Sequence, residues 1–249
     1  MLKQWHWAGQ YLATAAISFL EANEDDSHTN LGLDESGRYL STHPLGTAGK
    51  FVLDLAQGSL FLENRAENLL ALPGKTHEDI VQSLKHFFQE NGLGDYGYDL
   101  HYDLPYEQGN APFLWSDDTA MQAMRVQAHR LLEDCSRELG FCQVPRIWPH
   151  HFDSGVFGPS EHHSTLYFGM GLAVPDTLSE QHYYYLSAYQ QGQLLSAPQE
   201  SKLATGQWVE DEFEGAILRI DKESLPTDEE ILNFYRSTTQ GYIQDFSAD

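Results

Sequence analysis

The densest chemistry in the chain lies in residues 146–155, whose sequence is Arg-Ile-Trp-Pro-His-His-Phe-Asp-Ser-Gly. The β-favouring side chains and the prolines predict a single strand here. Side chains alternate between the two faces of a strand, so we expect His151 and Asp153 to share one face. Such a His-x-Asp pair supplies two ligands of a facial metal site or acts as a general-base pair. The same pair also occurs as a neutral histidine held by a carboxylate in a structural network, and this alternative is the more common one.

A second polar group of this kind is His28-Thr29-Asn30, where the sequence predicts the start of a strand after the first helix. Strand alternation places His28 and Asn30 on one face. Residues 3–91 and 117–246 also share an order of helix, strands and capped helix, which indicates a pseudo-two-fold repeat. Packing of the two halves about such an axis would bring these two side chains together with the pair on the later strand.

The predicted cluster has two functional interpretations. In the first, the protein is not a catalyst, and the cluster is structural or binds a small polar ligand. The ligand-binding residues are then His28, Asn30, Trp148, His151 and Asp153. In the second, the protein is an enzyme that depends on non-haem iron or another divalent metal. Its metal ligands are then His151 and Asp153 with a distant histidine, either His28 or His182.

The elements that must position these residues are predicted from apolar periodicity and capping signals. The helices are expected near residues 3–22, 77–91, 117–139 and 228–246. Thr76 caps the second helix, and Thr227 with Glu230 forms a capping box before the fourth. The segments between the helices predict β-hairpins and strands, above all at residues 51–62, 164–172, 182–189 and 214–220. We therefore expect an α+β fold with antiparallel sheets and four main helices.

Residues 93–115 are rich in Gly, Tyr, Asp and Pro, which is typical of a long connection. One short strand is expected near residues 98–102. We expect this connection to separate a first α+β half, residues 1–92, from a second half, residues 116–249, within one compact domain.

Composition and motifs exclude several classes of protein. The chain of 249 residues carries 37 acidic and 14 basic residues, a net charge of −23. Such a surface repels phosphate backbones and anionic membranes, so we expect no binding to nucleic acid. We expect no signal peptide, the chain has no apolar run of about eighteen residues, and the two cysteines fit no disulfide scaffold, so we expect a cytoplasmic protein. Phosphate-binding loops, the Rossmann fingerprint and H-E-x-x-H zinc spacing are absent as well.

The chain resembles an uncharacterised bacterial family of soluble proteins, a domain of unknown function. The matching segments are Asp25–Asn30, Trp148–Asp153, Tyr183–Tyr185, Trp208 and Phe213–Leu218. The loop from Gly155 to Ser164 departs from the family pattern because it is shorter. The family has no assigned activity, so the resemblance implies the location of a site and not a reaction.

Overall fold

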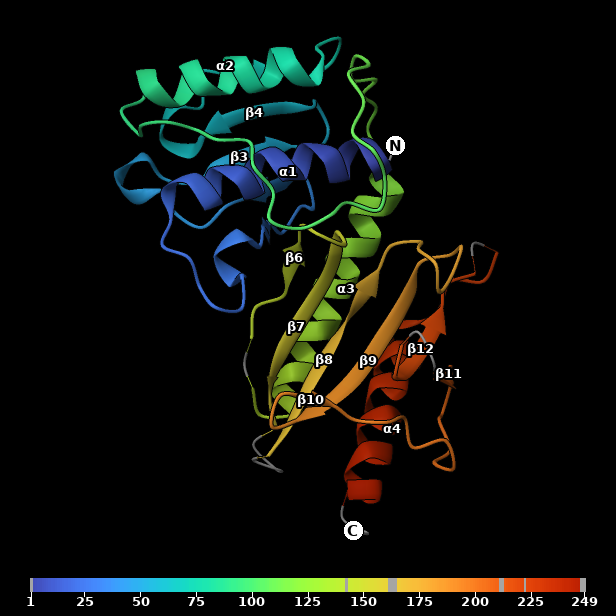
Figure 1. The fold of residues 1–249 in the computed structure, drawn as a ribbon. Coiled ribbons are helices and arrows are strands. Elements are labelled where there is room, and N and C mark those ends of the chain that lie inside the picture. Colours follow the sequence, from blue (N-terminus) through green and yellow to red (C-terminus); the bar gives the residue numbers. More distant parts are fainter. Residues whose placement is uncertain (1, 142, 161–164, 211–212, 222, 247–249) are drawn as a thin grey trace. The chain divides into compact units, whose positions relative to one another are not determined.

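The computed structural model describes residues 2–141, 143–160, 165–210, 213–221 and 223–246. It contains four α-helices and two antiparallel sheets, which confirms the predicted α+β class (Figure 1). None of the described helices is long and apolar enough to cross a membrane.

The chain forms two compact units that do not coincide with the predicted halves. Residues 1–126 and 146–152 form the first unit, and residues 127–145 and 153–249 form the second. The predicted connection at residues 93–115 lies inside the first unit, because it packs along the first helix.

The helices lie close to where capping signals and apolar periodicity place them. They are α1 (Leu2–Phe19), α2 (His77–Glu90), α3 (Thr119–Glu138) and α4 (Asp228–Phe246). The Thr76 hydroxyl accepts from the backbone N–H of Asp79 while the Asp79 carboxylate accepts from Thr76, a complete capping box. Thr227 and Glu230 form the same arrangement before α4.

The sheet of the first unit is an antiparallel meander in the order β1-β2-β3-β4-β5. Its strands are β1 (Gly32–Leu33), β2 (Tyr39–Ser41), β3 (Phe51–Asp54), β4 (Ser59–Leu62) and β5 (Leu70–Ala71). The predicted hairpin at residues 51–62 is the β3–β4 pair, and its turn leads from Asp54 to Ser59. Strand β6 (Arg146–Trp148) also belongs to this unit, where Ile147 bridges to Leu31.

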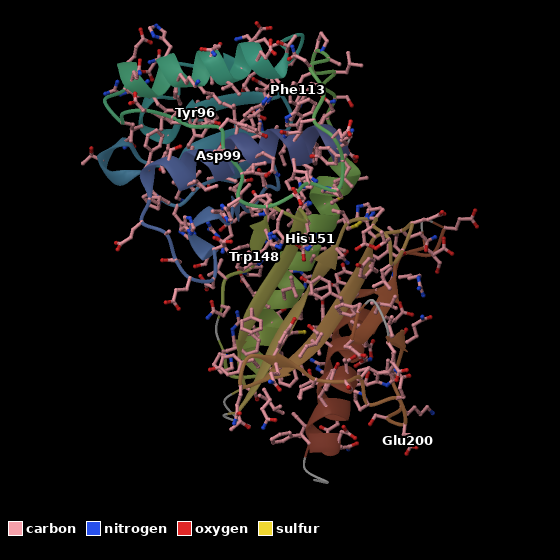
Figure 2. The ribbon with its side chains drawn as sticks, viewed as in Figure 1. Tyr96, Asp99, Phe113, Trp148, His151 and Glu200 are labelled. Carbon is pink, nitrogen blue, oxygen red and sulfur yellow. The ribbon has the colours of Figure 1, made fainter. Side chains whose placement is uncertain are left out.

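Helix α1 is buried on all sides between Trp5 and Ala16. The long connection after α2 lies along it: the hydroxyl groups of Thr14 and Tyr96 are 2.6 Å apart, and Tyr102 donates to Gln10 Oε1 at 2.8 Å. Figure 2 labels Tyr96 and Phe113 on this connection. No strand forms at residues 98–102. Side-chain hydrogen bonds to α1 take the place of strand pairing there.

The second unit contains α4, most of α3 and the strand order β11-β12-β9-β8-β7. The strands are β7 (Asp153–Pro159), β8 (Leu166–Ala173), β9 (Tyr183–Gln190), β10 (Gln193–Leu194), β11 (Gln207–Val209) and β12 (Gly215–Arg219). Helix α4 packs on one face of β9 and β12 (Figure 1). On that face Tyr235 donates to the carbonyl of Gly171 at 2.9 Å, and its ring meets Tyr184 edge to face.

Two predicted strands are only partly formed, and the residues that leave them belong to the predicted cluster. Residues 149–152 form a turn that separates β6 from β7, and Phe152 adopts a left-handed backbone with φ 64°. His28 belongs to a single turn of 3-10 helix, η1 (Ser27–Thr29). Strand alternation therefore does not apply to either His-x-polar pair.

The predicted repeat holds for the order of elements, since each unit has helix, strands and helix along the chain. It does not hold for strand order. The first sheet follows the chain without a crossover, whereas β12 of the second unit inserts next to β9.

Candidate functional site

Three backbone segments of the first unit lie side by side at residues 31–32, β2 and β6. Leu31 and Ile147 exchange both backbone hydrogen bonds, each of 2.8 Å. The residues next to such a pair face each other across an antiparallel ladder, so Gly32 lies opposite Arg146. Gly32 also pairs with Ser41 of β2. The side chains of Ser41 and Arg146 therefore share one face with Gly32 between them.

Arg146 approaches β1 closely because residue 32 has no side chain. A Cβ atom at Gly32 would lie 2.8 Å from Nη1 of Arg146 and 3.2 Å from Oγ of Ser41. With a Cβ at this position, the guanidinium would have to move from the place that it occupies. Glycine at this position thus leaves the space that the guanidinium occupies.

The Arg146 guanidinium is held by one residue on its inner edge. Nε donates to Oδ1 of Asn30 at 2.6 Å, and Nη2 donates to the carbonyl of Asn30 at 2.9 Å. Within the described part of the chain, Arg146 forms no ion pair with a carboxylate, and Nη1 has no acceptor. Burial lowers the pKa of Arg146 to about 10, so the group still carries its charge at neutral pH.

His43 adds a second donor beside this charge. Its Nε2 lies 3.1 Å from the carbonyl of Ser27 and 3.0 Å from Oδ1 of Asn30. Both oxygens only accept, so we assign the proton to Nε2. Burial, followed by the nearby charge of Arg146, lowers the pKa of His43 and keeps the ring neutral at neutral pH. The 3.1 Å approach of Arg146 Nη2 to His43 Nε2 is then a contact between two donors.

Trp148 continues the same face, because side chains two residues apart on a strand point the same way. It is half-buried, and it leads into the turn with its two histidines. The ring of His150 lies 6.2 Å from Trp148, 4.4 Å from His151 and 5.8 Å from Tyr102. Trp148 and His151 are labelled in Figure 2. The rings of Trp148, His150, His151 and Tyr102 thus form one aromatic group.

The turn after Trp148 is stabilised by contacts with side chains of α1 and α3. Nε2 of His6 and Nε2 of Gln10 each lie 2.8 Å from the carbonyl of Pro149. The His6 ring stacks on Phe152 at 5.1 Å, and Arg125 donates to the Phe152 carbonyl at 2.6 Å. Burial lowers the pKa of His6 to about 4, against the opposing effect of its hydrogen bond to Pro149. His6 is therefore a neutral donor at neutral pH.

Three of the predicted ligand-binding residues do not take part in this site. Nδ1 of His28 accepts from the backbone N–H of Asn23 at 3.2 Å. His151 is exposed. Asp153 belongs to the second unit and accepts from the Tyr185 hydroxyl at 2.5 Å. Among the described residues, no group of three or more His, Cys, Asp or Glu is arranged to hold a metal ion, so the predicted metal set is not assembled there.

Two of the predicted residues, Asn30 and Trp148, do lie on one face with the guanidinium. The sequence interpretation missed Arg146 and His43 as members of this site. One signal pointed to Arg146, because it is a charged residue at the head of an apolar β-like run in a chain with few basic residues. Nothing in the sequence near His43 indicates that it reaches the same place.

Comparisons of the chain with protein-family models, with curated proteins and with solved structures find no match. The resemblance to a family of unknown function stays a prediction. Function is therefore argued from the geometry of the first unit.

Proposed function

We propose that the first unit binds a small carboxylate ligand, one of whose oxygens accepts a hydrogen bond from Nη1 of Arg146. The observation that carries this proposal is the surplus of donors around the guanidinium. Nη1 of Arg146 has no acceptor within the described residues, and Nη2 faces the N–H of His43 at 3.1 Å.

A surplus of donors around a partly buried charge indicates that an acceptor is missing. A charge that is partly removed from water is costly unless it is paired or fully hydrogen-bonded. The chain has 37 acidic residues, yet none of the described ones pairs with Arg146. A bound anion beside Arg146 would accept from Nη1 and supply the acceptor that this nitrogen lacks.

A carboxylate fits this site better than a phosphate. Both anions match the planar fork of a guanidinium. However, the chain carries a net charge of −23, which repels a doubly charged anion more strongly than a singly charged one. The donors also present a single guanidinium and one neutral imidazole, which suits a single negative charge.

Calorimetric titration with acetate, lactate and benzoate tests the proposal. We expect at least one of these carboxylates to bind and to raise the melting temperature in proportion to its occupancy. Arg146→Gln should weaken that binding roughly 10- to 100-fold, since a hydrogen bond to a charged group contributes about 1.5–3 kcal/mol.

Arg65→Gln is the matched control. Arg65 is an exposed arginine of the same unit that donates to Asn91, so the variant changes the net charge equally without touching the site. Equal weakening by both variants would reduce the effect to general electrostatics. Binding of none of the three carboxylates, or preferential binding of inorganic phosphate, would also overturn the proposal.

A further inference from the structure

We infer that the ligand is an aromatic carboxylate, whose ring packs on Trp148 while its carboxylate meets Arg146. This inference rests on the proposed function and adds the chemical class of the ligand. It is carried by the position and exposure of Trp148.

Trp148 and Arg146 are neighbours on one face of β6. Two residues along a strand advance by about 6.6 Å, so the two side chains leave the strand at that spacing. Across the ladder, Trp148 lies opposite Asn30, the residue that holds the guanidinium. A molecule bound at Arg146 thus has Trp148 as its next neighbour along the strand.

Part of the Trp148 indole is also accessible to a ligand. The indole is half-buried, whereas Trp5 and Trp7 of the same unit are 0% and 4% exposed. In the first unit Trp115 uses its ring N–H to bond the carbonyl of Leu55. No hydrogen bond of the Trp148 N–H is found within the described residues, which is also true of the buried N–H groups of Trp5 and Trp7. The ring meets His150 edge to face, a geometry that aromatic rings prefer and that a ligand ring would extend.

The negative net charge of the chain favours a ligand that has an apolar ring in addition to its carboxylate. The chain's net charge of −23 opposes the approach of any anion, and a half-buried guanidinium offsets only part of that repulsion. Burial of an apolar ring does not depend on pairing the ligand's charge, so it supplies affinity that acetate lacks.

Calorimetry with three matched ligands tests the inference: acetate, cyclohexanecarboxylate and benzoate. We expect benzoate to bind about tenfold or more tightly than acetate, and more tightly than the non-planar cyclohexane analogue. Trp148→Leu should remove the preference for benzoate over acetate, and Trp148→Phe should keep part of it. Trp148→Phe should also abolish the change in tryptophan emission that benzoate causes.

The possible outcomes separate the two proposals. If acetate and benzoate bind equally and both depend on Arg146, the aromatic inference fails while the carboxylate site stands. If benzoate binds equally well to Arg146→Gln, the carboxylate site fails. If Trp148→Leu does not fold, as judged by circular dichroism, Trp148→Phe decides, and an unchanged emission response in that variant overturns the inference.

Discussion

Burial sets the ionisation of the side chains around the candidate site more than pairing does. Removal from water is the largest influence on the pKa values of His6, His43 and Arg146, and it lowers all three. The two histidines are neutral donors at neutral pH, whereas Arg146 stays charged. Arg146 and His43 thus combine one positive charge with a neutral imidazole.

His6 should make the stability of the first unit sensitive to acid. Its pKa is about 4 in the folded protein, against an ordinary value of 6.5, so the unfolded chain binds the proton first as pH falls. The free energy of unfolding should fall between pH 6.5 and pH 4 by about 3 kcal/mol, and level off below pH 4. His6→Phe should reduce this pH dependence of the free energy of unfolding, as measured by urea unfolding. The variant should still fold, because Gln10 still donates to the Pro149 carbonyl.

The exposed His86 on α2 provides the control for this experiment. His86→Gln should leave the pH dependence of the free energy of unfolding as it is in the parent. An equal slope in the parent and in His6→Phe would show that other groups cause the acid sensitivity.

At the scale of elements, the first unit is organised around a helix that is covered on all sides. Several polar side chains of α1 are buried, and the connection at residues 93–115 supplies partners for Thr14 and Gln10. Gln10 uses its amide for the Pro149 carbonyl and its Oε1 for Tyr102. One helical residue thus links the turn beneath the site to this connection.

Removal of two tyrosine hydroxyls should have unequal costs. Tyr102→Phe leaves the buried Oε1 of Gln10 without its donor, which should lower the free energy of unfolding by about 1–3 kcal/mol. Tyr96→Phe should cost less, about 0.5–1 kcal/mol, because the Thr14 hydroxyl still donates to the Gln10 carbonyl. Urea unfolding of both variants measures the difference. Equal costs, or a larger cost for Tyr96→Phe, would contradict this account.

At the scale of the whole molecule, the charge restricts the partners. The net charge of −23 comes from residues dispersed along the chain and not from one acidic tail. Screening by physiological salt limits the repulsion to about 8 Å, but a polyanion must approach more closely than that to bind.

The protein should therefore not retain DNA or RNA. A mobility-shift assay at physiological salt, with low-micromolar protein, should show free nucleic acid only. A shifted band that weakens as salt is raised would contradict the prediction, because it would reveal phosphate contacts from a basic surface.

The sequence by itself determined the local elements of this protein. Helix α2 follows from the cap at Thr76 and an apolar stripe, and α4 follows from the box at Thr227. The β3–β4 hairpin follows from two apolar runs around a glycine-containing turn. These features depend on neighbours within a few residues, so periodicity and capping are sufficient to predict them.

Only the tertiary structure decided the candidate site. The hydrogen bond from Arg146 to Asn30 joins residues 116 positions apart, and no local pattern encodes that approach. The left-handed conformation of Phe152 breaks the expected strand into β6 and β7, and buried contacts with His6 and Arg125 stabilise it. Strand alternation had grouped His151 with Asp153. Cross-strand pairing instead placed Arg146 over Gly32, beside Trp148, because the partner of a strand is chosen by packing and not by its own sequence.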